Sequence, residues 1–179
     1  MSTGARYPAL DILRGMTICF MIIVNTAGDY EHTFAPLLHA HWHGFTPTDL
    51  VFPSFLFVVG NAISFVQLKW QSLPASEVVL KILKRTALIF LLGYLMYWFP
   101  FIQESASGWS VKPIQETRVL GVLQRIALCY GIASLLIYFL QTRWVIAITL
   151  FLLVIYRFLL SHFGDLTLEG NAVLALDRW

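Results

Sequence analysis

Five long apolar stretches constrain the fold of this chain more than any other feature of its sequence. They cover residues 10–26, 50–68, 82–99, 119–140 and 144–160. Each has about the 17 to 25 residues that a helix needs to cross the hydrocarbon core of a bilayer. Charged residues make up only 12% of the 179 residues, against about 25% in soluble domains. The sequence therefore predicts an all-α fold, a polytopic integral membrane helix bundle with about five transmembrane helices.

Net charge and cysteine usage exclude other classes of protein. The 12 basic and 10 acidic residues give a net charge of +2. No basic stripe is visible, so no nucleic-acid partner is expected. Cys19 and Cys129 both lie within apolar stretches. We interpret them as small apolar residues, with no disulfide framework implied.

The distribution of basic residues predicts the orientation in the membrane. Residues 27–49, which connect the first two stretches, contain no Lys or Arg, whereas the N-terminal end and the next connection are basic. The basic residues on this second side are Arg6, Arg14, Lys69, Lys81, Lys84, Arg85 and Arg143. Because cytoplasmic loops are enriched in Lys and Arg, we expect a cytoplasmic N-terminus and an extracytoplasmic histidine loop in the cell (inner) membrane.

Three of the five histidines lie in that loop, at alternate positions: His39, His41 and His43. In an extended chain they would project to one side. Three histidines so arranged can bind zinc or copper, and a single one can act as a general base near neutral pH. No cysteine and no second histidine cluster supports a metal, so no metal is expected. The spacing alone does not decide which histidine acts.

The loop leads into a helix whose start the sequence marks clearly. Thr46 is expected to cap the helix, with Pro47 as its first residue and Asp49 as the acid of a capping box. A carboxylate near a histidine can also orient the ring and raise its basicity. Asn25 ends the first apolar stretch and offers a hydrogen-bonding amide, although an Asn at a helix C-terminus is common without any function.

Ionisable groups at membrane depth cost about 2.5 to 3.5 kcal/mol each on insertion scales, so they usually have a partner or a function. Asp11 and Arg14 share a helix face and can form an ion pair. This pair either anchors the span at the interface or leaves Arg14 to hold an anionic cosubstrate. Gln124 and Arg125 are adjacent and flanked by apolar residues. We expect them to face a polar cavity between helices.

Several motifs resemble those of one family of membrane acyltransferases. Residues 10–15 (Leu-Asp-Ile-Leu-Arg-Gly) resemble the opening of several such families. The Val-Asn pair at 24–25 and the His-Ala-x-Trp motif with its sequel to Phe-Pro at 39–53 are similar to a narrower group. Residues 121–125 and 169–172 continue the likeness. The chain thus resembles the heparan-α-glucosaminide N-acetyltransferase family and its bacterial relatives.

The resemblance implies an enzyme that moves an acetyl group from cytoplasmic acetyl-CoA to an amino sugar or glycan on the far side of the membrane. It assigns catalysis to His39 and makes Asn25 a second active-site candidate. Asp49 would orient His39 or the acceptor. The residues themselves make Arg14, Arg125 and Gln124, which precedes Arg125, candidates to bind coenzyme A. The two arginines would contact its phosphates.

The family has about twice as many spans as this chain. Residues 1–179 are therefore expected to be one transmembrane acyltransferase domain, truncated on its C-terminal side. Two alternatives from other classes are a transporter or permease segment and a metal-binding membrane subunit that uses the histidine loop. Gly131 and Ser134, at small-x-x-small spacing, predict close helix packing and leave a homo-oligomer possible.

Overall fold

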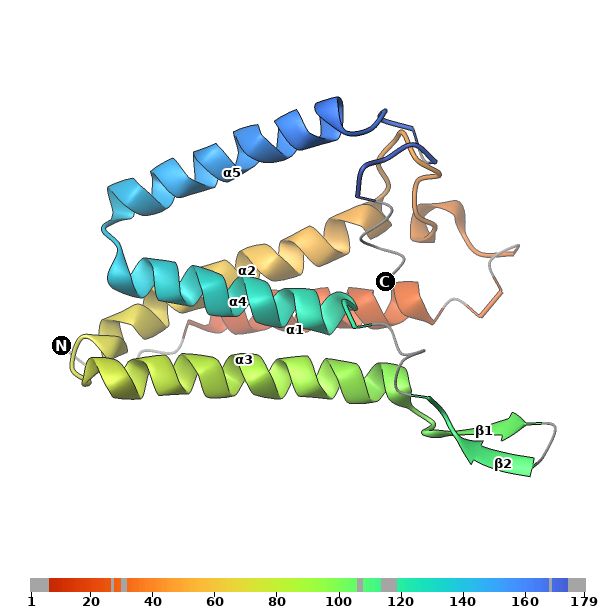
Figure 1. Cartoon of the computed structure of the whole chain (residues 1–179), viewed down its shortest axis with the longest axis horizontal. Helices are drawn as coiled ribbons and strands as arrows, with labels where there is room; N and C mark the ends of the chain where they lie inside the picture. The colour runs from red at the N-terminus through yellow and green to blue at the C-terminus, as the bar shows by residue number, and fades with distance from the viewer. Residues whose placement is uncertain are drawn as a thin grey trace. The chain divides into compact units, whose positions relative to one another are not determined.

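The computed structural model describes residues 7–26, 28–29, 32–105, 108–113, 119–167 and 169–173, with the side chains of 103–105 excepted. Helices dominate this part of the chain (Figure 1). The elements in chain order are α1 (Pro8–Asn25), a 3-10 turn η1 (Ala35–Leu37), α2 (Pro47–Trp70), α3 (Ala75–Trp98), β1 (Ile102–Ser105), β2 (Gly108–Val111), α4 (Val122–Phe139) and α5 (Thr142–His162). The five α-helices fall on the five apolar stretches, which confirms the predicted helical class.

Four helices in the described part of the chain are long and apolar enough to cross a membrane: α1, α2, α4 and α5. Helix α3 has 24 residues but carries four charges in its first half, at Glu77, Lys81, Lys84 and Arg85. The prediction that the three basic residues belong to a connecting loop is wrong. The helix starts earlier, at Ala75 after Pro74, and the i,i+4 pair of Glu77 and Lys81 at 3.7 Å supports its first turns.

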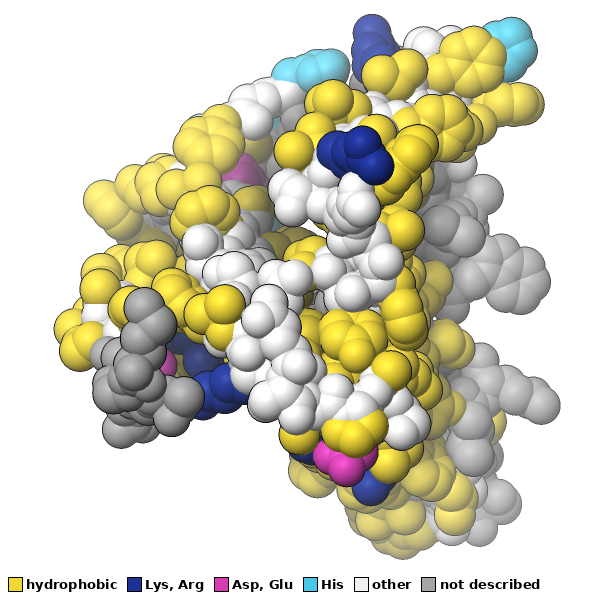
Figure 2. Space-filling view, turned by 90° about the vertical axis from the view of Figure 1, so that its left-hand side faces the viewer, with side chains coloured by type: hydrophobic (Ala, Val, Ile, Leu, Met, Phe, Trp, Pro, Cys, Tyr) yellow, Lys and Arg dark blue, Asp and Glu magenta, His cyan; other side chains and the backbone are white. Residues whose placement is uncertain are grey.

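The helices expose much of their apolar surface. In α5 no residue is buried, and Val154, Phe151 and Leu153 are 69%, 63% and 61% exposed. Figure 2 shows hydrophobic side chains over most of the described surface that faces the viewer. Such a surface suits contact with lipid, where an apolar side chain gains nothing by turning inward.

The chain forms two compact units, Met1–Leu68 and Lys69–Trp179. The first contains α1, the histidine loop and nearly all of α2. The second contains α3, the β1–β2 hairpin, α4 and α5. The closest helix pairing in the second unit is that of α3 with α4, which run side by side (Figure 1).

Glycines allow this close approach of α3 and α4. A Cβ on Gly131 would lie 2.8 Å from Thr86 Oγ1, and a Cβ on Gly93 would lie 2.7 Å from Leu123 Cβ. Ser134, one turn after Gly131, is fully buried. The close packing expected from Gly131 and Ser134 is therefore confirmed, and α3 is the partner that Gly131 meets.

The two-stranded hairpin between α3 and α4 was not predicted. Its strands are antiparallel and have four residues each, with Ile102 paired to Val111 and Ser105 paired to Gly108. Such short strands give too few alternating positions to stand out in a sequence. The hairpin does not change the helical class of the fold.

We predict that Gly93→Ala destabilises the second unit by about 1–3 kcal/mol, because the added methyl group overpacks the α3–α4 contact. Thermal unfolding of the detergent-purified protein, followed by size-exclusion fluorescence, measures the effect as a lower midpoint. Gly60→Ala in α2 is the matched control, because a Cβ there meets nothing within 4 Å. It is expected to leave the midpoint unchanged or to raise it, since Ala favours helix over Gly by about 1 kcal/mol. Equal midpoints for the two variants would contradict the packing described here.

Candidate functional site

The site begins at the N-terminus of α2. Pro47 is the first helical residue, as expected, and Thr46 precedes it. Asp49 Oδ2 accepts hydrogen bonds from the backbone N–H and from the hydroxyl of Thr46, both at 2.9 Å. The acid half of the predicted capping box is thus confirmed. The Thr46 hydroxyl donates to the carboxylate instead of accepting from the Asp49 N–H, which bonds the Thr46 carbonyl at 3.1 Å.

The same carboxylate binds His39 across ten residues of loop. His39 Nδ1 lies 2.7 Å from Asp49 Oδ1, and the backbone N–H of Ala40 donates to Asp49 Oδ2 at 3.3 Å. The donors from His39, Ala40 and Thr46 all stabilise the ionised carboxylate, as does its place in the first turn of a helix. The structure therefore brings together two of the three predicted catalytic residues.

This contact determines which nitrogen of His39 can react. An ionised carboxylate only accepts hydrogen bonds, so the proton between the two groups is assigned to Nδ1. Nε2 then carries the free lone pair of the neutral ring. The side chain of His39 is 69% exposed while that of Asp49 is 27% exposed. The carboxylate is sheltered, and the ring that it orients is accessible.

Asn25 is the last residue of α1. Its Nδ2 donates to the carbonyl of Met21, one turn earlier, at 2.8 Å, and the residue is exposed. This is the ordinary role of an Asn at a helix end that the sequence suggested. The second N–H of the amide is chemically able to donate to another group, so a role for Asn25 in catalysis stays a prediction.

The remaining histidines of the motif do not continue the pattern. His41 and His43 are exposed, and the backbone bends over residues 41–44 with Gly44 at φ +143°. The prediction of an extended stretch, in which the three histidines would project to one side, is therefore wrong. Within the described residues no three His, Cys, Asp or Glu side chains lie close enough to hold a metal ion.

A second histidine–carboxylate pair lies in the same loop and was not predicted. His32 Nδ1 is 2.6 Å from Asp29 Oδ2, and the two side chains are 83% and 60% exposed. The Asp-x-x-His spacing was the signal available in the sequence. This pair is local and exposed, whereas the pair of His39 with Asp49 ties a loop to the start of a helix.

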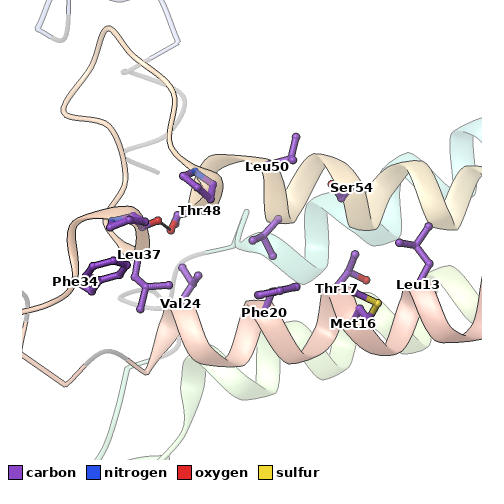
Figure 3. Close-up of a pocket in the computed structure, with 13 residues that line it drawn as sticks. Leu13, Met16, Thr17, Phe20, Val24, Phe34, Leu37, Thr48, Leu50 and Ser54 are labelled. Atoms are coloured by element: carbon purple, nitrogen blue, oxygen red, sulfur yellow. Dashed lines mark hydrogen bonds between the residues drawn. The ribbon is translucent and has the colours of Figure 1, made fainter.

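An apolar pocket of about 390 Å³ lies in the first unit, between α1, the η1 turn and the start of α2 (Figure 3). Its walls include Phe20, Leu37 and Thr48, and Thr48 immediately precedes Asp49. The Thr48 hydroxyl donates to the Pro36 carbonyl at 3.0 Å, so this polar group is already used within the wall. The lining therefore favours a hydrocarbon group over a polar one.

The residues expected to bind coenzyme A differ in their surroundings. Arg14 lies 4.0 Å from Asp11, as the predicted ion pair requires, and its side chain is 40% exposed. Arg125 Nε donates to the Leu120 carbonyl at 3.2 Å. Their contact with coenzyme A stays a prediction.

The expectation of a polar cavity around Gln124 is wrong. Gln124 is fully buried, and its Oε1 occupies the space that side chains on Gly93 and Gly121 would fill. Gly93 and Gly121 leave room for the Gln124 amide in the α3–α4 contact, and the amide packs there. Its amide atoms have no hydrogen-bond partner among the described residues.

The fold and the site together define a class of protein: a helical membrane protein with a histidine–carboxylate pair at the N-terminus of a helix. The family model described as "Heparan-alpha-glucosaminide N-acetyltransferase, catalytic" matches residues 6–175. This match covers nearly the whole chain, and the chain belongs to that family.

Two curated relatives agree with this assignment. The heparan-alpha-glucosaminide N-acetyltransferase of Mus musculus is 29% identical over 142 residues, which are 77% of this chain and 20% of that protein. The Homo sapiens protein of the same name is 29% identical over 135 residues, 73% of this chain and 19% of that protein. This chain therefore spans about one-fifth of the length of the curated relatives that it matches.

We predict that Asp49→Ala exposes the histidine loop to solvent exchange. The amides of Ala40 and Thr46 lose their acceptor, and hydrogen bonds to a charged group contribute about 1.5–3 kcal/mol. Their exchange should therefore accelerate by about tenfold or more. Hydrogen–deuterium exchange of peptides covering residues 38–46 measures this change. Asp29→Ala, which removes the exposed pair with His32, is the control and should leave these peptides unaffected; similar acceleration in both variants would refute the role of Asp49.

Proposed function

We propose that this chain carries the acetyl-transfer site of a membrane N-acetyltransferase that moves an acetyl group from acetyl-CoA to the amino group of a saccharide. The observation that supports this proposal most strongly is the 2.7 Å hydrogen bond between His39 Nδ1 and Asp49 Oδ1. It lies within the segment that matches the family. A histidine held by a carboxylate at one ring nitrogen presents the other for proton transfer or for nucleophilic attack.

His39 Nε2 is the reacting atom in this proposal. As a general base it takes a proton from the acceptor amine while the amine nitrogen attacks the thioester carbonyl. The C–N bond forms, the C–S bond breaks, and the imidazolium returns the proton to the leaving thiolate. In the alternative route Nε2 attacks the thioester itself and carries the acetyl group to the amine. Stoichiometric release of coenzyme A without an acceptor would identify the second route.

Asp49 and Asn25 assist His39 in different ways. Asp49 is a positioning residue: it holds the Nδ1–H tautomer and stabilises the imidazolium that forms during transfer. Asn25 would donate its second amide N–H to the thioester carbonyl as that oxygen gains negative charge. The developing charge is the reason why a donor is needed there and why an aliphatic side chain would not serve.

The phosphates of coenzyme A require a cationic partner, and we assign this role to Arg14, near the start of α1. Arg125 is in the first turn of α4, which lies on the extracytoplasmic side in the orientation proposed below, so we leave it out of the phosphate site. Arg14 supports the assignment because its ion pair with Asp11 is long, at 4.0 Å, and its side chain is 40% exposed. Gln124 would reach a cosubstrate only if α3 and α4 separated, because it is fully buried between them. We therefore leave Gln124 out of the phosphate site.

The reaction is proposed to cross the cell membrane. The basic residues near the start of α1 and in the first half of α3 favour a cytoplasmic location for both. The histidine loop, which lacks Lys and Arg from residue 27 to residue 49, would then face the opposite side. In this arrangement acetyl-CoA arrives from the cytoplasm and the saccharide acceptor from outside.

We predict that His39→Ala in the intact protein lowers acetyl transfer by about 10²- to 10⁴-fold, the usual contribution of a general acid or base. Coenzyme A release by purified membranes, with a panel of amino sugars as acceptors, measures the rate. His32→Ala is the matched control, because His32 pairs with Asp29 in the same loop but is not assigned a role in transfer. Normal transfer by His39→Ala, or an equal loss in both variants, would disprove the assignment.

Asp49→Asn keeps the shape of the side chain but removes its charge. We expect kcat to fall by up to about 10⁴-fold, the loss that an Asp-to-Asn change causes where the carboxylate fixes the tautomer of a reacting histidine, with KM for the acceptor little changed. Thr46→Val is the control: it removes one donor to the same carboxylate and leaves the charge in place. A purely structural role for Asp49 would instead raise KM or lower the amount of folded protein, without a selective loss in kcat.

A further inference from the structure

We propose that the acceptor of the acetyl group is a glycolipid, an amino sugar joined to a hydrocarbon chain. Its chain occupies the apolar pocket of the first unit, and its sugar lies at His39. The pocket is the space of about 390 Å³ between α1, η1 and the start of α2 (Figure 3). This inference rests on the acetyl-transfer function proposed above and adds the class of acceptor to it.

The pocket is long and follows the helices that form it. Leu13, Phe20 and Val24 line it from α1, at intervals of seven and four residues that place them on one face of the helix. From Leu13 to Val24 the helix rises about 16 Å, at about 1.5 Å per residue. In Figure 3, Val24 and Thr48 lie at the end of the pocket next to the loop, and Leu13 lies at the far end. A space drawn out over this length suits a chain better than a compact group.

The lining is apolar because two of its three hydroxyl side chains are already bonded within the wall. Thr17 is 6% exposed and donates to the Arg14 carbonyl at 2.9 Å. Thr48 is 3% exposed and donates to the Pro36 carbonyl at 3.0 Å. A ligand amide placed beside them would lose its hydrogen bonds to water without gaining equivalent ones. The pantetheine arm of coenzyme A carries two such amides, so a hydrocarbon chain fits the lining better.

The wall of the pocket continues directly into the pair of His39 and Asp49. Leu37 lines the pocket and lies two residues before His39, and Thr48 lies one residue before Asp49. Residues two apart have Cα atoms at most about 7.6 Å from each other. The 2.7 Å hydrogen bond between His39 and Asp49 therefore closes the loop at this end of the pocket. A chain that leaves the pocket here carries its head group to the exposed ring of His39.

The charges of the loop distinguish an amino sugar from the head group of a phospholipid. Residues 27–49 contain Asp29, Glu31 and Asp49 and no Lys or Arg. A phosphate at this place would meet carboxylates without a lysine or arginine of the loop to bind it. An amino sugar brings no negative charge, and its amine is the group that His39 Nε2 must reach in the proposed reaction. The observations therefore favour a chain that ends in an amino sugar.

Acetyl transfer by the intact protein in phosphatidylcholine proteoliposomes tests the proposal, with n-dodecyl and methyl glucosaminide as the two acceptors. Two variants fill the pocket from opposite walls: Ser54→Phe on α2 and Met16→Trp on α1. Ser64→Phe is the matched control, because Ser64 is exposed on the same helix and does not line the pocket. Gel filtration verifies that each variant is folded.

We expect kcat/KM of the unmodified protein to be at least about 10²-fold higher for the dodecyl acceptor, since each buried methylene contributes about fourfold. Filling the pocket should lower this ratio by about tenfold or more, whereas Ser64→Phe should leave it unchanged. Partition of the chain into the bilayer raises the ratio equally in all variants. An unchanged ratio in both pocket variants would therefore overturn the proposal.

Two further outcomes separate this proposal from the function on which it rests. Equal kcat/KM for the two acceptors would show that the acceptor is a water-soluble sugar, which refutes the glycolipid and leaves acetyl transfer in place. Failure of the unmodified protein to acetylate either acceptor would refute acetyl transfer to amino sugars, and the glycolipid with it.

Photo-crosslinking of the unmodified protein gives a measurement that depends neither on turnover nor on a variant. The probe is dodecyl glucosaminide with a diazirine on its chain, irradiated in phosphatidylcholine liposomes. We expect labelling to concentrate in residues 13–24 and 47–54 and to fall when unlabelled dodecyl glucosaminide is added. Labelling that is as strong on α5, whose residues are all unburied, would mean that the pocket does not select the probe over phospholipid, and the proposal would be wrong.

Discussion

The Asp49 carboxylate is the interaction on which the candidate site depends. It accepts hydrogen bonds from His39, Ala40 and Thr46, and so it starts α2, closes the histidine loop and orients the imidazole at once. A charge in this place is tolerated because the first turn of a helix leaves backbone N–H groups unpaired and favours an anion. The candidate site is thereby located where a polar loop meets an apolar helix.

The carboxylate lies between two different surroundings, an exposed polar histidine and an apolar pocket. The pocket beside it is lined by apolar side chains of α1, η1 and α2, while His39 projects into an accessible position. In the second unit a different principle operates: glycines at 93 and 131 let α3 and α4 approach closely. Contact between backbones is the usual way in which membrane helices associate, since lipid supplies no hydrophobic force between them.

Local rules predicted a large part of this structure. The helices, the start of α2 at Pro47 and the close packing at Gly131 all follow from residues that are neighbours in the sequence or lie one turn apart. Two predictions were wrong for different reasons. The loop assigned to Lys81, Lys84 and Arg85 is helical although all three residues are exposed, because a helix can present charged residues on an exposed face. The cavity expected at Gln124 is a packed contact, because Gly93 and Gly121 leave room for its amide.

The sequence by itself determined the class of the fold, the family motifs and the set of residue types available for acetyl transfer, because apolar length and short motifs are properties of neighbouring residues. The spacing of the three histidines in the loop did not distinguish them, and the resemblance assigned catalysis to His39. Only the tertiary structure decided that His39 meets Asp49, that His32 meets Asp29, and that Leu37 and Thr48 line one pocket. The hydrogen bond between His39 and Asp49 joins residues ten positions apart, and no periodicity specifies how a loop closes.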